Sequence, residues 1–321
     1  MLSRRIGLCR IDREALLEFK FHTLDVFTQE RFGGNPLAVV HGADDLSTEA
    51  MQTIAAEFNL SETVFVMKAE QPAHSAKVRI FTPKSELPFA GHPTVGTAVL
   101  LAELRATEAG GGRDALVMLE ENIGLVRAGV RIGTAPGLVS FAEFDGPKIP
   151  VMETSLPDRA DIAAAVGLIP GEIGFANHQP TIFDAGARIL FVPVGSRAVL
   201  AKAGPNLSQW SRALGVHSDI QAYVYCNQPE QGDAHYRARM FAPSLGILED
   251  PATGGAAAAF AGVVKHFDDL RDGMHKRHIE QGYEMGRPSQ IELSLEVAGG
   301  KLTGFRIGGY AVRVSEGTIT V

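Results

Sequence analysis

His92 and Asp250 each stand just before a long run of small and apolar residues, and glycines follow closely in both places. Such runs are typical of helices that are buried on every side. A helix start offers free backbone N–H groups and a partial positive charge, which suit a small anion such as a carboxylate. A histidine and an aspartate beside that anion could bind polar groups and move protons. Either residue alone would more often be a helix cap.

Glycines near these two helix starts are the second chemical signal. Gly96, Gly254 and Gly255 leave the backbone bare of side chains, so a ligand could approach it closely. The alternative is that these glycines only permit tight packing of the helices against a sheet. The chain holds 35 glycines in 321 residues, well above the usual share of roughly 7%.

Glu62 is the third candidate, because it lies between a predicted helix and a predicted apolar strand. A carboxyl group at the edge of a buried strand would have a raised pKa through desolvation, which suits an acid–base catalyst. The alternative is an exposed glutamate in a turn. These residues alone favour that alternative.

An internal repeat indicates how the chain positions these residues. Three pairs of segments match in the same order: 34–40 with 186–192, 79–83 with 239–243, and 91–96 with 249–254. Each half reads as a strand, a proline-containing loop and a buried helix, with the helices over about 93–104 and 253–266. We predict two similar domains that face each other, with His92 and Asp250 at matching positions.

The expected fold class is α+β, with a curved, mostly antiparallel sheet or barrel around one apolar helix in each domain. A length of 321 residues agrees with about two domains. We expect an N-terminal appendage over 1–19, a first domain over 20–148 and a second over 149–321. The first domain could also take the last strand of the chain.

Composition excludes several classes of protein. The 30 Lys and Arg residues against 37 Asp and Glu residues leave a formal net charge of −7, so a nucleic-acid partner is not expected. The sequence has no apolar run of membrane-spanning length and no secretory leader, so we expect neither a membrane partner nor export. Two cysteines are too few for a disulfide scaffold or a structural zinc site. We therefore expect a cytoplasmic protein without a bound metal.

Seven sequence motifs together resemble the PhzF-like isomerase family of phenazine biosynthesis. They occupy residues 21–27, 34–40, 61–63, 89–96, 249–254, 281–282 and 286–289. The resemblance runs from about residue 20 to 321. It implies the diaminopimelate-epimerase-like fold, with two pseudosymmetric domains and an active-site cleft between them. It also implies a cofactor-independent isomerase that forms a homodimer and acts on a small anionic substrate.

The resemblance assigns roles to individual residues. Glu62 would be the general acid–base, while His92 and Asp250 would help to bind substrate and relay protons. Backbone amides around the helix starts would hold a substrate carboxylate. The residues expected to bind substrate are Asn35, Gly91, Gly96, Thr253, Gly254 and Gly255.

Gly255 departs from the family pattern, because some members have a serine there that contacts substrate. The backbone N–H remains and the hydroxyl is lost, so the sequence leaves the substrate open. A two-thiol racemase of the same fold is disfavoured, since Cys9 and Cys226 lie away from the two helix starts. A non-catalytic protein that binds small anions on the same scaffold is the remaining alternative.

Overall fold

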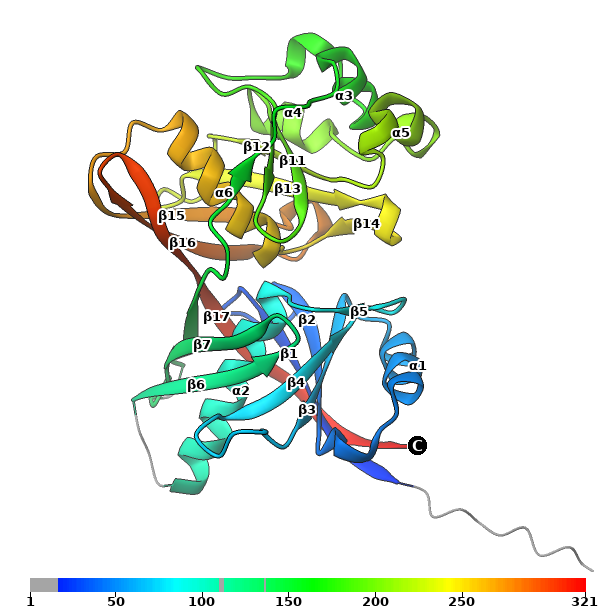
Figure 1. The fold of residues 1–321 in the computed structure, drawn as a ribbon, viewed down its shortest axis with the longest axis vertical. Coiled ribbons are helices and arrows are strands. Elements are labelled where there is room, and N and C mark those ends of the chain that lie inside the picture. The colour runs from blue at the N-terminus through cyan, green and yellow to red at the C-terminus, as the bar shows by residue number, and fades with distance from the viewer. Residues whose placement is uncertain (1–16, 110–112, 136) are drawn as a thin grey trace, which may run out of the picture.

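The computed structural model describes residues 17–109, 113–135 and 137–321, which form two stacked halves (Figure 1). Most of the expected N-terminal appendage over 1–19 lies outside the described residues. The described helices are α1 (Thr48–Phe58), α2 (Gly91–Ala109), α3 (Arg159–Ala165), α4 (Arg197–Lys202), α5 (Leu207–Leu214) and α6 (Gly254–Phe267).

The strands of the first half are β1 (Glu18–Val26), β2 (Asn35–His41), β3 (Glu62–Met67), β4 (Ala76–Phe81), β5 (Glu86–Leu87), β6 (Asp114–Glu121), β7 (Gly124–Arg131) and β8 (Ser140–Asp145). Those of the second are β9 (Val151–Met152), β10 (Thr181–Asp184), β11 (Arg188–Pro193), β12 (Gln221–Cys226), β13 (Tyr236–Ala242), β14 (Ile247–Asp250), β15 (Gly273–Gln281) and β16 (Ser289–Ala298). A last strand, β17 (Lys301–Thr320), serves both. The fold is therefore mixed α+β.

The first half is a closed barrel around α2. Strand pairing runs in a ring through β1, β2, β3, β4, β6, β7, β8 and β17 and returns to β1. Residues 91–100 of α2 are all buried inside it. The all-round apolar sequence of this helix is what a barrel interior requires, because no side of the helix faces water.

The second half curves its own sheet around α6. Its strands pair in the order β9, β10, β11, β12, β13, β15, β16 and β17. The small residues of α6, mostly alanines, let the sheet pack closely against the helix. The opposite face of this sheet is covered by α3, α4 and α5, which enclose a second apolar core around Trp210 and Leu200.

Strand directions repeat between the halves. Most pairs are antiparallel, but β2 with β3 and β4 with β6 are parallel. The corresponding pairs β11 with β12 and β13 with β15 are parallel too. A helical crossover occupies the same place in each half, with α1 between β2 and β3 and α4 and α5 between β11 and β12.

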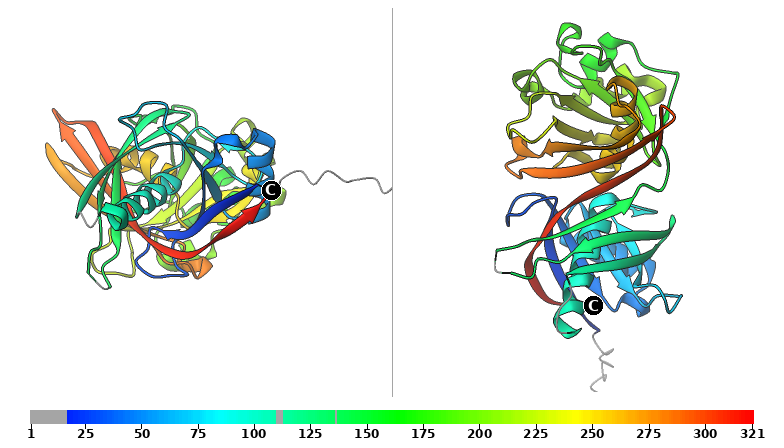
Figure 2. Two further views of the ribbon diagram at one scale, coloured as in Figure 1. Left: turned by 90° about the horizontal axis from the view of Figure 1, so that it is seen from below. Right: turned by 90° about the vertical axis from the view of Figure 1, so that its left-hand side faces the viewer.

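Strand β17 runs from one half into the other, as the side view in Figure 2 shows. Residues 301–308 pair with β16, residues 306–311 with β8 and residues 311–320 with β1. The same strand therefore ends the second sheet and closes the first barrel.

Helix α2 begins at Gly91, earlier than the predicted start near residue 93, and ends at Ala109 instead of 104. Pro93 is compatible with this start, because the first turn of a helix leaves its N–H groups unpaired in any case. His92 therefore lies inside the first turn and does not precede the helix. Helix α6 begins at Gly254 with Thr253 as its N-cap, so Asp250 is not its cap.

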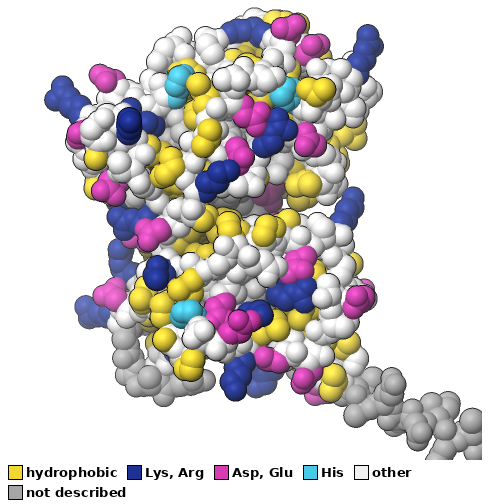
Figure 3. Space-filling view, viewed as in Figure 1, with side chains coloured by type: hydrophobic (Ala, Val, Ile, Leu, Met, Phe, Trp, Pro, Cys, Tyr) yellow, Lys and Arg dark blue, Asp and Glu magenta, His cyan; other side chains and the backbone are white. Residues whose placement is uncertain are grey.

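The two central helices start against each other at the waist of the molecule, where hydrophobic side chains gather on the surface (Figure 3). A Cβ on Gly91 would lie 2.8 Å from Cα of Gly254, and a Cβ on Gly254 would lie 2.8 Å from Cα of Gly91. Neither position accepts a side chain without moving backbone. None of the described helices is long and apolar enough to cross a membrane.

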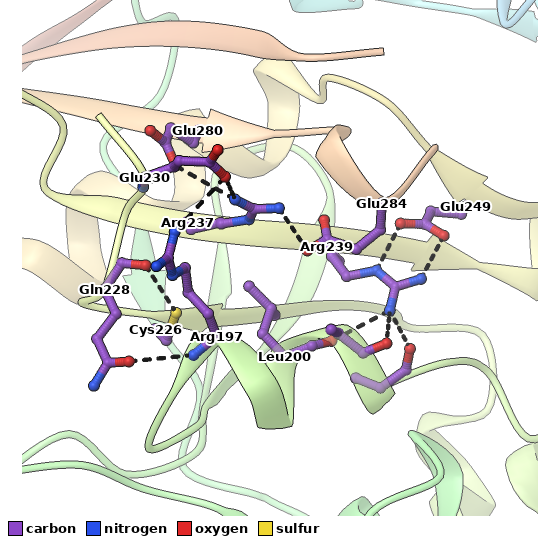
Figure 4. Close-up of polar contacts among 12 residues, drawn as sticks. Arg197, Leu200, Cys226, Gln228, Glu230, Arg237, Arg239, Glu249, Glu280 and Glu284 are labelled. Atoms are coloured by element: carbon purple, nitrogen blue, oxygen red, sulfur yellow. Dashed lines mark hydrogen bonds and ion pairs between the residues drawn. The ribbon is translucent and has the colours of Figure 1, made fainter. Parts of the chain in front are cut away.

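Repeated arginine–glutamate pairs brace the sheets close to the waist. Arg79 on β4 donates to Glu86 on β5 at 2.7 Å, and Arg239 on β13 donates to Glu249 on β14 at 2.8 Å. Arg239 also donates to the last carbonyls of α4, among them that of Leu200 at 3.2 Å (Figure 4). These contacts fix the short strand that leads to each central helix.

Gly254 and Gly255 form a matched pair for testing the contact between the helices. We expect Gly254→Ala to lower the free energy of unfolding by about 1–3 kcal/mol, because the added methyl group meets backbone. Gly255→Ala should be neutral or slightly stabilising, since its Cβ would meet open space and alanine favours helix. Urea unfolding of both variants measures the difference. Equal free energies of unfolding for the two variants would show that the contact between Gly91 and Gly254 tolerates a side chain.

Candidate active site

A cleft of about 370 Å³ opens between the two halves at the helix starts. Its floor includes Glu62, His92 and Asp250 together with the starts of α2 and α6. Gly91, Thr253, Gly254 and Gly255 also line it. The structure therefore brings most of the predicted site residues into one cavity.

The helix starts supply the electrostatics of the cleft. The first N–H groups of α2 and α6 lack partners within their own helices, and both helix dipoles place partial positive charge there. Gly91 and Gly254 pack against each other, whereas a Cβ on Gly255 would meet nothing within 4 Å, so Gly255 leaves open space beside this backbone. A carboxylate is the natural ligand of two such converging helix starts.

Glu62 is the first residue of β3, and its side chain is only 12% exposed. Nδ1 of His92 lies 3.2 Å from Oε2 of Glu62, and His92 is almost fully buried. Burial, and then the charge of Asp250, raise the pKa of Glu62 well above its usual range. Burial lowers the pKa of His92 to about 3, so its imidazole is neutral at pH 7. The contact is therefore not an ion pair.

Asp250 is the last residue of β14 and is held by three donors. Nδ2 of Asn35 donates to Oδ1 at 2.9 Å, the Ser61 hydroxyl donates to the same oxygen at 3.3 Å, and the Thr253 hydroxyl donates to Oδ2 at 2.5 Å. Burial raises the pKa of Asp250 to about 6, although these hydrogen bonds act in the opposite direction. Asp250 therefore titrates close to neutral pH.

Gln281, at the end of β15, holds the segment that carries Asp250. Its Nε2 donates to the Asp250 carbonyl at 2.8 Å and to the Thr253 hydroxyl at 3.0 Å. Its Oε1 accepts from the backbone N–H of Thr253 at 3.2 Å and from the Tyr223 hydroxyl at 3.3 Å. Both polar atoms of the Gln281 side chain thus help to position the start of α6.

Two of the predicted substrate-binding residues lie elsewhere. A Cβ on Gly96 would meet the side chains of Leu37 and Val26, so this glycine allows α2 to pack on the sheet and does not face the cleft. Asn35 is fully buried, and its Nδ2 donates to Oδ1 of Asp250 and to the carbonyl of Ala252. Asn35 therefore lies behind Asp250 and does not line the cleft.

His92 and Asp250 are not at matching positions, contrary to the sequence-based expectation. Gly91 and Gly254 start their helices, so His92 corresponds to Gly255. Asp250 pairs with Met240 as Leu87 pairs with Ile80, which makes Leu87 the counterpart of Asp250. The helix starts and these strand ends are both offset by 163 residues and not by 158. The hairpin of β13 and β14 is the longer one, since Arg239 and Glu249 are 10 residues apart whereas Arg79 and Glu86 are 7 apart.

Glu62 also has a counterpart that cannot titrate. It begins β3 opposite Leu37, and Gln221 begins β12 opposite Ile189. Gln221, Leu87 and Gly255 all line the cleft. The titratable groups therefore occupy one side of a pseudosymmetric cavity, and the other side presents an amide, an apolar side chain and bare backbone.

Sequence reasoning did not single out Glu121, the residue of the first half that corresponds to Gln281. Both residues end the strand that runs parallel to β4 or β13 in the same register. Glu121 contacts the Thr94 hydroxyl at 2.8 Å, as Gln281 contacts that of Thr253. The offset between segments 79–83 and 239–243, applied to residue 281, would have pointed to Glu121.

Glu121 is arranged as a protonated acid. The Thr94 hydroxyl lies 2.8 Å from the Ala90 carbonyl and 2.8 Å from Oε1 of Glu121. A hydroxyl holds one proton and a carbonyl only accepts, so both contacts are satisfied when Glu121 carries a proton of its own. Burial raises the pKa of Glu121 to about 8, which agrees with that state.

The described residues that line the cleft include no cysteine. Within residues 17–109, 113–135 and 137–321, no three His, Cys, Asp or Glu side chains are placed to hold a metal ion. Cys226 is buried in the core beneath α3, α4 and α5. Cys9 lies outside the described residues.

A family profile, sequence relatives and a solved structure all relate this chain to the same group of proteins. The profile of the family described as phenazine biosynthesis-like protein, PhzC–PhzF, matches residues 24–317. An uncharacterized isomerase of Mesorhizobium japonicum is 48% identical over 92% of this chain and 97% of its own length. The trans-2,3-dihydro-3-hydroxyanthranilate isomerase of Pseudomonas aeruginosa is 35% identical, with coverage of 93% and 98%. A PhzF-family crystal structure from Bacillus anthracis superposes with a TM-score of 0.83 at 24% identity, with coverage of 95% and 100%.

The protonation of Glu121 predicts a pH-dependent stability difference. The folded state keeps its proton up to about pH 8, whereas the unfolded state releases it above about pH 4.5. Wild-type stability should therefore fall as pH rises through this window, by about 1.4 kcal/mol per pH unit. Glu121→Gln removes the loss, so it should match the wild type at pH 4 and exceed it at pH 7. Urea unfolding at the two pH values measures this.

The neighbouring Glu120 is the matched control. Its carboxylate accepts hydrogen bonds from the backbone N–H groups of Glu70 and Gln71, which lower its pKa to about 2. Glu120→Gln should therefore lose stability at pH 7. A destabilised Glu121→Gln at pH 7 would mean that this carboxyl is ionised in the folded protein.

Proposed function

Because the chain belongs to the phenazine biosynthesis-like PhzC–PhzF family of isomerases, we propose that it moves a proton on a small carboxylate-bearing substrate without a cofactor. The substrate is an amino acid-like molecule, either open-chain or cyclic. The substrate named for the Pseudomonas aeruginosa relative is a cyclic one. The scaffold is of the diaminopimelate-epimerase type. The observation that carries the proposal is the buried Glu62 facing two open helix starts.

The substrate carboxylate binds to the N–H groups at the starts of α2 and α6. Ionised Glu62 takes a proton from the carbon beside this carboxylate, and the electron pair passes into the conjugated system of the substrate. Partial positive charge at the helix starts stabilises the negative charge that develops there. Protonated Glu62 then returns the proton to another carbon of the same molecule, so atoms and charge balance.

The surroundings of Glu62 suit both steps. Its raised pKa makes the ionised form a stronger base than an exposed carboxylate, and it makes reprotonation of the substrate possible at neutral pH. Neutral His92 contacts Glu62 and can exchange hydrogen bonds with it without fixing its charge. Asp250 faces the same space, and its negative charge further raises the proton affinity of Glu62.

One-sided placement of the titratable groups favours a proton shift over racemisation by two bases. A two-base racemase needs a proton acceptor on one side of the substrate and a donor on the other. Here Gln221, Leu87 and Gly255 occupy the second side. Gly255 also leaves room for a side chain, since a Cβ there would meet nothing within 4 Å. That room is available to the substrate.

Substitution of the acid–base tests the proposal directly. We expect wild-type protein in deuterated water to incorporate carbon-bound deuterium into a member of a panel of cyclic and linear amino acids. Glu62→Gln should lower the rate at least about 100-fold, because the general acid–base is lost. NMR of the substrate measures the exchange. Glu57→Gln, on the exposed face of α1, is the charge-matched control. Binding without any exchange in the wild type would instead indicate a small-anion-binding protein.

Asp250 should set the acid limb of the pH profile. Exchange requires ionised Glu62, so its rate should rise with pH, and the charge of Asp250 moves this rise to higher pH. Asp250→Asn removes the repulsion, and the acid limb of its residual activity should move to lower pH. Exchange rates between pH 5 and 9 on the substrate identified above measure the shift. An unmoved limb would show that the two carboxyl groups do not interact.

A further inference from the structure

Lys84 lies at the mouth of the cleft on a turn that the sequence makes rigid. The turn follows β4, and the Thr82 N–H donates to the Ser85 carbonyl at 2.8 Å. The Thr82 hydroxyl oxygen accepts from the backbone N–H groups of Lys84 at 3.2 Å and Ser85 at 2.9 Å. Pro83 restricts the backbone at the position before Lys84. The backbone from which the lysine side chain extends is therefore held in place.

The Lys84 side chain reaches across the mouth to the second half. A Cβ on Gly246, which follows the turn Pro243–Leu245, would overlap Nζ of Lys84 and lie 2.9 Å from its Cε. Gly246 has a φ of 79°, in the region that favours glycine. Bare backbone at Gly246 thus leaves space for the lysine between the two halves.

The Lys84 ammonium has no carboxylate partner in the described part of the chain. The other ionisable groups on the cleft wall are Glu62, His92 and Asp250, which lie at its floor. These three groups are two carboxyl groups and a histidine whose pKa burial lowers to about 3, so none of them supplies a positive charge at neutral pH. Lys84 is the one Lys or Arg side chain among the described residues that line the cleft.

The wall between the floor and Lys84 is mainly apolar. It is formed by Leu87, Phe89, Ile189, Met240, Leu245 and Ile247. A molecule that fits this cavity has a carboxylate at the helix starts and an apolar body along the wall. Its far end then meets an ammonium group that has no other partner.

We propose that Lys84 is a specificity-determining residue that binds a second anionic group of the substrate, so that the enzyme selects compact dianions over monocarboxylates. The inference rests on the proposed function, because the helix starts must hold the first carboxylate. A cavity of about 370 Å³ accommodates a six-membered ring with two such groups. Lys84 takes no part in the proton transfer.

Benzoate and the three benzenedicarboxylates test this with one ring and a changing second group. Calorimetric titration of the wild type should show at least fivefold tighter binding of the best dicarboxylate than of benzoate. Lys84→Met should abolish that preference and leave benzoate affinity unchanged, and Lys84→Arg should restore most of it. Lys301→Met, an exposed charge change on β17 outside the cleft, should leave the preference intact.

The two proposals fail in different ways. Wild-type binding of benzoate without a dicarboxylate preference would overturn the role of Lys84 and leave the carboxylate site at the helix starts. A preference that survives in Lys84→Met would overturn it as well. If benzoate and all dicarboxylates fail to bind, the carboxylate site itself is wrong. Loss of exchange in Glu62→Gln is measured separately and does not depend on Lys84.

Discussion

The approach of Gly91 to Gly254 is the constraint on which the site depends. With 2.8 Å between a notional Cβ and the facing Cα, the two helices start in van der Waals contact of bare backbone. This contact makes the two positive helix ends converge on one space. It also brings β3 and β14 close enough for Glu62 and Asp250, from different halves, to share an electrostatic environment. A larger side chain at either glycine would separate the charges that the cleft combines.

A symmetric frame carries an asymmetric set of functional groups. The strand order, parallel pairs and arginine–glutamate braces repeat, yet Glu62, His92 and Asp250 correspond to Gln221, Gly255 and Leu87. The reverse occurs outside the cleft, where Glu121 of the first half occupies the position of Gln281, and each contacts a threonine hydroxyl. The strand frame is therefore retained while the groups that titrate differ.

Much of this arrangement could be predicted from the sequence. The all-round apolar runs identified α2 and α6 as buried. Glu62, His92 and Asp250 do meet in one cleft. The pairing of His92 with Asp250 was wrong because the sequence match set Gly91 against Glu249, whereas the structure sets Gly91 against Gly254. Gly96 was misplaced because a glycine beside a helix start looks the same whether it faces a ligand or a sheet. Lys84 was missed because its position depends on Gly246, far away in the sequence.

Strand β17 has a consequence for the order of folding. The Thr23 and Ser315 hydroxyls, 292 residues apart, meet across β1 and β17 at 2.7 Å. The first barrel, which is synthesised first, therefore lacks one of its strands until almost the whole second half has been made. Until then β1 and β8 expose unpaired edges, and α2 is covered only in part. Such long-range pairing is slow to form, so the N-terminal half depends on the C-terminal half for its completion as well as for its chemistry.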